Sequence, residues 1–419
     1  MVLRNRLRHA HRAAGMLIAV VLVGGSMTAC TSKSGDTNST SSTKAPLVIG
    51  ASISLTGDFA DPGKAVKAGY ELWASTVNAK GGLLGRQVQL KIVDDTSSPD
   101  QVVTNYQNLI NKDKVDLVIG PFSTLLTIPA SQVAKRYGYA FLEPAGGGPK
   151  VFEQKLDNLF FVQPAPVVKQ GDVFADWILS LPAADRPKTA AYTELDDPFA
   201  TPVAENIRTR FEAAGITTVY KQVYPAETQD FSPIMAKVAA TKPDVIVGGT
   251  QSEDAYGQVK SLIQLKYNPK FMFLSNGANS PVEFPDKVGA NNTEGIMSSG
   301  DWFPGSTAAG SAEFADAYVK AYGGTPDSID NTSAEAYAVG QVLEEVAKKT
   351  GKIDNATIIA TLHQGTWPTL LGDLSWDAYG APNGSFHLIQ WQGGKLVPVY
   401  PPEIAAGHAP VFPKPAWGG

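Results

Sequence analysis

The sequence predicts an α/β protein with two doubly wound parallel sheets, one in each of two lobes. Strand-like apolar runs alternate with amphipathic helical runs, and this alternation occurs twice in succession. Several strand runs, such as VDLVIGP at 115–121, are short and continuously apolar, which is typical of parallel strands covered on both faces. A length of 419 residues also exceeds one ordinary core and suggests two domains.

In the first series, Asp61 and Pro62 predict an N-cap and a first-turn proline for the first helix. Ser98 and Gln101 form a capping-box pattern at the start of the second helix. The expected strands are 47–55, 87–95, 115–121 and 139–144, and the expected helices are 61–82, 98–114 and 123–138.

After the run at 158–166, a second series of alternating strands and helices begins. Its expected strands are 188–194, 217–225, 244–250 and 270–277, and its helices are 201–215, 231–243 and 252–267. Three helices follow at 310–324, 333–351 and 355–365. A β-rich end spans 371–400, where Pro382-Asn383-Gly384 predicts a turn between two strands.

The first 29 residues are typical of an export signal. Four arginines precede an apolar run at 13–23, which as a helix would span about 16 Å, short of the roughly 30 Å core of a bilayer. A cleavable signal is therefore favoured over a transmembrane helix. The residues MTAC, ending at Cys30, resemble a bacterial lipobox, so we expect lipidation of Cys30 followed by a Ser/Thr-rich tether to residue 46. An ordinary signal peptide with an incidental cysteine is the alternative.

The composition argues against catalysis and nucleic-acid binding. Without the four signal arginines, 31 basic and 40 acidic residues remain, so no excess of positive charge is available for nucleic acid. No cysteine follows Cys30, and the three later histidines lack paired-ligand spacing. GDFADPGKA at 57–65 fails the phosphate-loop pattern, and no GxSxG motif occurs. We expect no enzyme activity, no metal and no other cofactor.

Five stretches carry a resemblance to a known family: IGASISLTGDFADPG (49–63), the runs at 69–95 and 115–138, AEAYAVGQVLEEV (334–346) and the run at 374–396. They resemble the extracytoplasmic solute-binding proteins of ABC transporters, in particular the branched-chain amino-acid/amide receptor family. The resemblance implies the type I periplasmic-binding-protein fold, with a ligand in the cleft between two lobes joined by three crossovers.

The crossovers are expected near 163–166, 298–301 and 381–384. The corresponding boundaries are 1–29 for the signal peptide, 30–46 for the lipidated cysteine and tether, 47–164 with 301–381 for lobe 1, 165–300 with 382–405 for lobe 2, and 406–419 for a C-terminal tail.

Ligands of open α/β sheets bind outside the carboxyl ends of the strands. Ser123 and Thr124 open a helix whose free N–H groups favour an anion or a carbonyl oxygen. The alternatives are that these two residues only cap the helix, that Phe199 is a core residue, and that the glycines only shape the backbone. The candidate ligand-binding residues are Phe59, Ser123, Thr124, Ala145, Gly146, Gly147, Phe199, Thr250, Gln251 and Asn276.

Two departures from the family bear on the ligand. Members that bind free amino acids hold the carboxylate with a threonine where this chain has Gly147, and the ammonium group with a glutamate where it has Asn276. A neutral amide or urea would suit these residues, unless another carboxylate substitutes for the glutamate. The candidate substitutes are Glu143, Asp196, Asp197, Glu253 and Asp301.

The resemblance thus implies a monomeric receptor, anchored by lipid at the outer face of the cell membrane, that passes a small polar solute to an ABC permease. A ligand-sensing receptor of the same fold, coupled to a signalling partner, is the alternative. Neighbouring permease and ATPase genes would favour transport, and a kinase gene would favour sensing.

Overall fold

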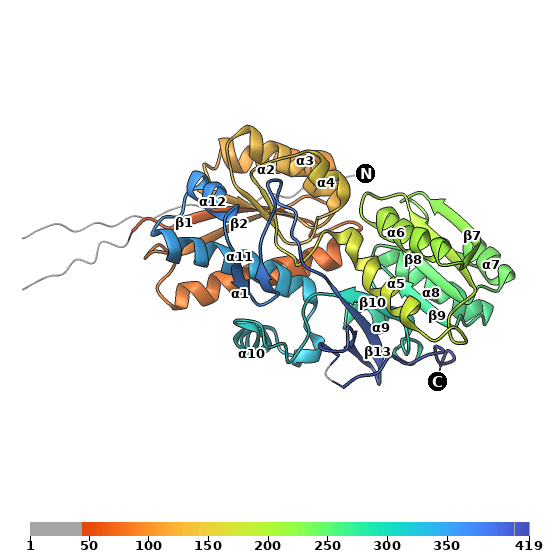
Figure 1. Ribbon diagram of the computed structural model, residues 1–419. Coiled ribbons are helices and arrows are strands. Elements are labelled where there is room, and N and C mark those ends of the chain that lie inside the picture. Colours follow the sequence, from red (N-terminus) through yellow and green to blue (C-terminus); the bar gives the residue numbers. More distant parts are fainter. Residues whose placement is uncertain (1–43, 406, 419) are drawn as a thin grey trace, which may run out of the picture. The chain divides into compact units, whose positions relative to one another are not determined.

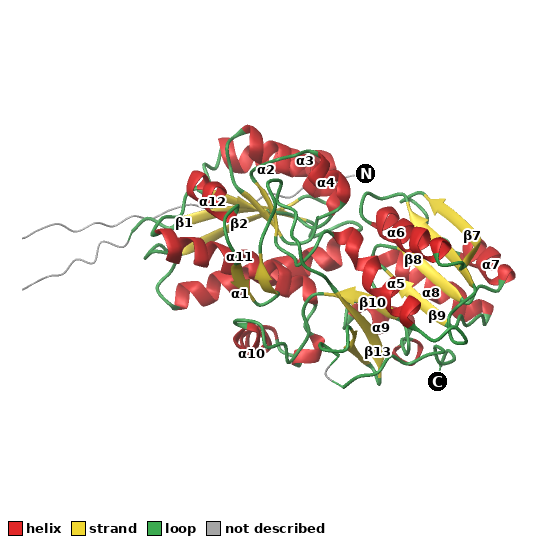
Figure 2. Cartoon of the chain, viewed as in Figure 1, coloured by secondary structure: helices red, strands yellow, loops and turns green. Residues whose placement is uncertain are grey.

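Two β-sheets, each covered by helices on both faces, make up most of the computed structural model, which describes residues 44–405 and 407–418 (Figures 1 and 2). The predicted α/β class is confirmed. The export signal, Cys30 and most of the expected tether lie outside the described residues.

The first sheet has the strand order β2-β1-β3-β4-β5, and all of its strands are parallel. Helices α2 and α3 cover one face, and α1 and α11 cover the other (Figure 1). The strands are β1 Leu47–Ile53, β2 Val88–Asp94, β3 Leu117–Ile119, β4 Phe141–Glu143 and β5 Leu159–Phe161. The helices are α1 Ala60–Ala79, α2 Pro99–Asn111, α3 Thr124–Arg136, α4 Pro149–Glu153, α10 Ser311–Tyr322, α11 Asn331–Thr350 and α12 Asn355–Leu362.

The second sheet repeats this order as β7-β6-β8-β9-β10 and then adds the antiparallel strands β13 and β14. It is therefore mixed rather than wholly parallel. Its strands are β6 Thr189–Leu195, β7 Thr217–Tyr224, β8 Val245–Gly249, β9 Phe271–Leu274, β10 Met297–Gly300, β13 His387–Gln392 and β14 Lys395–Tyr400. Its helices are α5 Gln170–Ser180, α6 Ala200–Ala213, α7 Ser232–Thr241, α8 Ser252–Leu265 and α9 Glu283–Val288.

Short elements complete the described chain. A separate two-stranded sheet pairs β11 Trp367–Thr369 with β12 Gly372–Leu374. Single 3₁₀ turns are η1 Val167–Lys169, η2 Ala290–Asn292 and η3 Pro326–Ser328.

The described residues form two separate hydrophobic cores. The first core combines residues from 47–162 with residues from 302–376, and the second combines 161–297 with 386–399. The chain passes between these cores three times, at segments close to the three expected crossovers. The first and third crossings meet directly, because the Gly384 N–H donates to the Pro164 carbonyl at 2.6 Å.

The helix starts show which cap predictions hold. The Ser98 side chain accepts a hydrogen bond from the Gln101 N–H at 3.4 Å, which confirms Ser98 as the N-cap of α2. The predicted Asp61 cap is wrong: α1 begins one residue earlier, at Ala60, with Phe59 as its N-cap residue. The Phe59 N–H is instead satisfied by the Ser97 hydroxyl at 3.0 Å, so the start of α1 needs no acidic cap.

One feature of the C-terminal region differs from the expected pattern. Residues 382–384 lie in the expected third crossing, between β12 and β13, but they form no turn there, and Pro382 instead forms a β-bridge with Trp376. The tail beyond residue 405 packs on the second core, where the Phe412 ring stacks on Phe271 at 5.7 Å and the Lys414 N–H donates to the Lys270 carbonyl at 2.8 Å.

Candidate functional site

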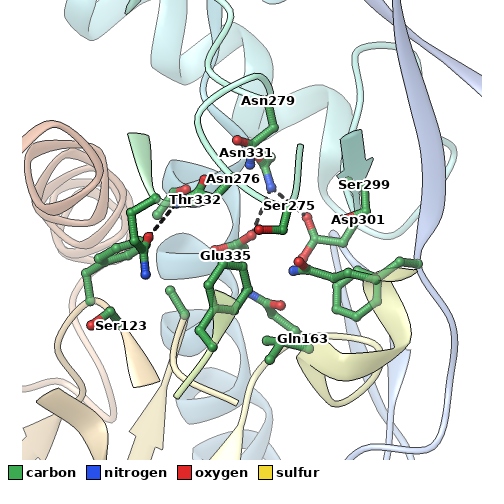
Figure 3. A pocket seen from close by; sticks show the side chains of 18 residues that line it. Ser123, Gln163, Ser275, Asn276, Asn279, Ser299, Asp301, Asn331, Thr332 and Glu335 are labelled. Atoms are coloured by element: carbon green, nitrogen blue, oxygen red, sulfur yellow. Dashed lines mark hydrogen bonds between the residues drawn. The ribbon is translucent and has the colours of Figure 1, made fainter. Parts of the chain in front are cut away.

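A pocket with about 470 Å³ of unfilled space lies where the strands of both sheets reach their carboxyl ends. Residues that follow β3, β4 and β5 of the first sheet and β6, β8, β9 and β10 of the second sheet line it, together with the first two turns of α11 (Figure 3). This is the position at which open α/β sheets bind ligands. The lining residues are Phe122, Ser123, Ala145, Gln163, Val167, Gln170, Phe199, Gln251, Ser275, Asn276, Asn279, Ser299, Gly300, Asp301, Asn331, Thr332, Glu335 and Phe386.

Five of the ten candidate residues meet in this pocket: Ser123, Ala145, Phe199, Gln251 and Asn276. Ser123 is the N-cap residue of α3, yet its side chain makes no capping hydrogen bond. Its φ of 93° is unusual for a residue other than glycine, and such strained backbone is often found at functional sites. Phe199 is both a member of the second core and part of the pocket wall.

The structure places three of the other five candidates in supporting roles. Phe59 packs edge-to-face on Phe122, with ring centroids 5.7 Å apart. The Thr124 hydroxyl accepts a hydrogen bond from the Gly148 N–H at 3.1 Å. The Thr250 hydroxyl donates to the Asn276 carbonyl at 2.8 Å and so fixes the backbone of a pocket residue.

The two candidate glycines, Gly146 and Gly147, do not line the pocket, and neighbouring side chains lie close against their Cα atoms. A Cβ at Gly146 would lie 2.2 Å from the Thr127 hydroxyl oxygen. A Cβ at Gly147 would lie 2.2 Å from the ring of Phe161. Both distances are far below van der Waals contact, so neither position has room for a side chain in this arrangement.

Several pocket residues come from segments that were not among the candidates. The first two turns of α11 contribute Asn331, Thr332 and Glu335, and the Asp330 side chain caps this helix by accepting the Thr332 N–H at 2.9 Å. A signal was available in the sequence: Glu335 interrupts an otherwise apolar run, and its spacing of four from Asn331 places both on one helix face.

Six polar side-chain atoms of the pocket are buried without a hydrogen-bond partner. They are Ser123 Oγ, Gln163 Oε1, Gln170 Oε1, Gln251 Nε2, Ser299 Oγ and Asp301 Oδ2. A buried polar atom without a partner costs about 1–3 kcal/mol. Such a concentration at one place is typical of a site whose partners arrive with a ligand.

Two carboxyl groups, Asp301 and Glu335, share one amide donor in this pocket. Asn331 Nδ2 donates to Asp301 Oδ1 at 3.3 Å and to Glu335 Oε1 at 2.9 Å (Figure 3). Burial raises the pKa of Asp301 to about 7. Burial and the nearby charges of Asp301, Asp330 and Glu143 raise the pKa of Glu335 well above its usual value. The pair therefore holds protons near neutral pH unless a positive charge approaches.

Of the five carboxylates considered as substitutes for the missing glutamate, only Asp301 lines the pocket. Glu143 lies beneath it, where its carboxyl accepts the Ala145 N–H at 3.1 Å and burial raises its pKa to about 8. Asp197 accepts N–H bonds from the first residues of α6. Asp196 and Glu253 line a larger adjoining cavity.

Asn276 and Gln251, which also line the pocket, form an amide pair. Asn276 Nδ2 donates to Gln251 Oε1 at 2.9 Å, which leaves Gln251 Nε2 without a partner. This pair can therefore offer an N–H donor to a ligand oxygen.

In residues 44–405 and 407–418, no group of three or more His, Cys, Asp or Glu side chains is arranged to hold a metal ion. Among the helices of these same residues, none is both long enough and apolar enough to span a bilayer.

Residues 46–395 match the family described as periplasmic binding protein. A similar sequence is the Leu/Ile/Val-binding protein BraC3 of Rhizobium johnstonii, 27% identical over 369 residues that cover 84% of this chain and 94% of that protein. A Leu/Ile/Val-binding protein homolog of Brucella melitensis is 26% identical over 358 residues, with 84% and 93% covered.

Solved structures share the fold. The leucine binding protein LivK from Thermotoga maritima superposes with a TM-score of 0.75 at 19% identity and covers 84% of this chain and 97% of its own. LivJ from Streptococcus pneumoniae, in complex with isoleucine, gives 0.74 at 21% identity, with 88% and 100% covered. An ABC-transporter solute binding protein from R. palustris, in complex with benzoate, gives 0.73 at 20%, with 88% and 97% covered. The chain therefore belongs to the periplasmic binding protein family, has the type I fold of that family, and is a solute-binding protein rather than an enzyme.

Proposed function

We propose that this chain is the extracytoplasmic receptor of an ABC importer and that it captures a small amino-acid- or amide-like solute. The observation that supports this most is the pocket itself, in which six buried polar atoms lack partners at the carboxyl ends of the parallel strands of two sheets. The family and the names of its relatives point to the same role.

The two sides of the pocket suit the two ends of such a solute. Asp301 and Glu335 face its nitrogen end, whereas Ser123 and the Gln251 amide face its oxygen end. The rings of Phe122, Phe199 and Phe386 supply apolar walls between them. Small-molecule sites commonly combine apolar walls with a few oriented polar groups in this way.

Capture is proposed to occur by closure of two lobes, 47–164 with 301–381 and 165–300 with 382–405. The separate cores and three crossings support this division. A solute that contacts both lobes binds the closed state better than the open one, so it shifts the population toward closure. The permease would then recognise the closed, monomeric receptor.

The receptor is proposed to be held at the outer face of the cell membrane by a lipid on Cys30. Replacing it (Cys30→Ser) is expected to release the protein from membranes while leaving solute binding unchanged. Fractionation and metabolic labelling with an alkyne fatty acid would test this, and an unlabelled wild-type protein would contradict it.

A thermal-shift screen of the mature protein against amino acids, amides, amines, ureas and small sugars tests the proposed function. A solute at one hundred times its Kd stabilises the folded state by about 2.7 kcal/mol. We expect hits in the nitrogen-containing classes. The proposal fails if no class raises the melting temperature or if only sugars do.

A further inference from the structure

Two larger cavities share lining residues with the binding pocket, and acidic side chains outnumber basic ones in the lining of all three. The first cavity, with about 1200 Å³ of unfilled space, shares Gln251 with the pocket. The second, with about 890 Å³, shares Asn276, Asn279 and Thr332. A solute entering through either cavity therefore passes the side chains that line it.

Ten carboxylates and two lysines line these three cavities. The Lys64 ammonium group lies 3.8 Å from the Asp61 carboxylate and forms an ion pair with it. Lys64 therefore offsets little of the charge of the other carboxylates. Clefts lined by one sign of charge concentrate ions of the opposite sign. The carboxylates are Asp58, Asp61, Asp196, Asp197, Glu253, Asp254, Glu283, Asp301, Asp330 and Glu335; the lysines are Lys64 and Lys260.

The pocket itself contains two carboxyl groups and no Lys, Arg or His among the 18 described residues that line it. Asp301 is only 4% exposed, and its Oδ2 atom has no partner. A buried carboxyl with one oxygen unpaired lacks the cation or donors that would stabilise its charged form.

The unpartnered atoms on this side of the pocket are mainly acceptors. Gln163 donates through Nε2 to the Pro144 carbonyl at 2.7 Å, which leaves its Oε1 atom free. Gln170 Oε1 and Asp301 Oδ2 are also free, and Gln251 Nε2 is the one obligate donor among the six unpartnered atoms. The serine hydroxyls can donate or accept, so N–H donors of a solute would satisfy the glutamine oxygens and an ionised Asp301.

From this geometry we infer that the solute is a small organic cation, carrying an amine, amidinium or guanidinium group whose N–H atoms bind Asp301, Glu335 and Gln163. The inference rests on the proposed receptor function and narrows its substrate class. It differs from what the ligands of the solved structures would suggest, because isoleucine and benzoate both carry a carboxylate. A solute carboxylate in this pocket would face two carboxyl groups and no cationic side chain.

Isosteric series that differ only in charge test this inference. Acetamidinium, acetamide and acetate form one series, and L-leucinamide with L-leucine forms a second. Each compound is titrated calorimetrically into the mature protein at constant ionic strength and pH 7.5. The cation of a series is expected to bind at least tenfold more tightly than its neutral or zwitterionic counterpart.

Two matched variants locate the effect. Asp301→Asn keeps an acceptor for Asn331 but removes the charge, and it should reduce the cation preference at least tenfold. Asp196→Asn is the same replacement at an exposed position of the adjoining cavity, and it should preserve the preference. Melting curves without solute establish that both variants fold.

The outcomes separate this inference from the receptor function. Neutral or anionic members that bind as well as the cations overturn the inference and leave the receptor function standing. The same holds if hits come only from neutral classes of the broad screen, or if a neutral or anionic compound co-purifies with the protein in native mass spectrometry. No binding by any compound in either experiment overturns both.

Discussion

The ring of Phe161 fills the space into which a side chain at position 147 would project. A Cβ built on Gly147 would lie 2.2 Å from the Phe161 ring carbon Cε1. Phe161 is fully buried at the end of β5, so its ring has little freedom to move. Position 147 therefore has glycine instead of threonine, and the Phe161 ring occupies the space that a threonine side chain would need. The threonine that holds the carboxylate in receptors of free amino acids has no counterpart there.

Gly147→Thr is therefore expected to destabilise the protein rather than to create an amino-acid site. Overpacking of a dense core costs about 1–3 kcal/mol. Chemical denaturation measures the loss, and a double-mutant cycle with Phe161→Ala attributes it. The cost of Gly147→Thr should shrink in the Phe161→Ala background, because the clashing ring is gone. An unchanged cost in that background would show that the ring is not the obstacle.

Removing either of two neighbouring hydroxyl groups should affect a different property, solute binding for Ser123 and folding stability for Thr124. Ser123 Oγ is buried without a partner, whereas Thr124 Oγ1 accepts the Gly148 N–H at 3.1 Å. Ser123→Ala should weaken solute binding about tenfold and leave the melting temperature nearly unchanged. Thr124→Ala should lower the free energy of unfolding by about 1 kcal/mol with a smaller effect on binding. Equal effects of the two variants on binding would contradict the placement of Ser123 at the solute.

The raised pKa of Asp301 gives the solute-free protein a pH dependence with a definite sign. Its pKa is about 7 when folded and near the ordinary 3.8 when unfolded, so between these values the folded state binds more protons. The contribution of Asp301 to stability is therefore present below about pH 4 and is lost as the pH rises toward 7, by up to about 1.4 kcal/mol per pH unit for one proton. The neighbouring ionisable groups that raise the pKa of Glu335 are Asp301, Asp330 and Glu143, and all three are acidic.

Asp301→Asn removes that titration. The stability of the variant relative to the wild type should increase as the pH rises from 4 to 7, which urea denaturation at several pH values can measure. Parallel stability curves for the two proteins would contradict an unusually high pKa at Asp301.

Glu335→Gln removes the second buried carboxyl while keeping an acceptor for Asn331. It should stabilise the solute-free protein above pH 7, because the repulsion between Asp301 and Glu335 disappears. It should also weaken binding of a cationic solute at least tenfold. Glu344→Gln is the matched control on the same helix; there the side chain accepts the Trp73 indole N–H at 2.9 Å outside the pocket. A similar loss of binding in both variants would contradict a specific role for Glu335.

The position of the pocket could be predicted largely from the local sequence pattern. Alternating strand and helix periodicity located most elements, and the rule for parallel sheets placed Ser123, Ala145, Phe199, Gln251 and Asn276 at strand ends that meet. Helix α5 was not expected, because its residues follow a proline-rich crossing without a strong start signal. The end of β10 was expected as a crossing and as the position of one candidate carboxylate, Asp301, whereas Ser299 beside it was not among the candidates.

The proximity of Asp301 and Glu335 could not be predicted from the local sequence pattern. Asn331 joins Asp301 to Glu335, and α11, which carries Asn331 and Glu335, is itself held against α1, where the Ser333 hydroxyl donates to the Ala65 carbonyl at 2.8 Å. That contact joins segments 268 positions apart in the chain. Helical periodicity predicts which face of α11 is buried, but it does not say which side chains the buried face meets.

The sequence by itself determined the fold class and the two α/β series. It also predicts the export signal with its single cysteine and the strand ends at which a solute would bind. Each follows from the spacing of residues along the chain, and spacing is a local property. Only the tertiary structure decided that Phe161 fills the space beside Gly147, that Asn331 joins two carboxyl groups, and that acidic side chains gather around the pocket. These depend on distances between residues remote in sequence, because packing and electrostatic interactions act through space rather than along the chain.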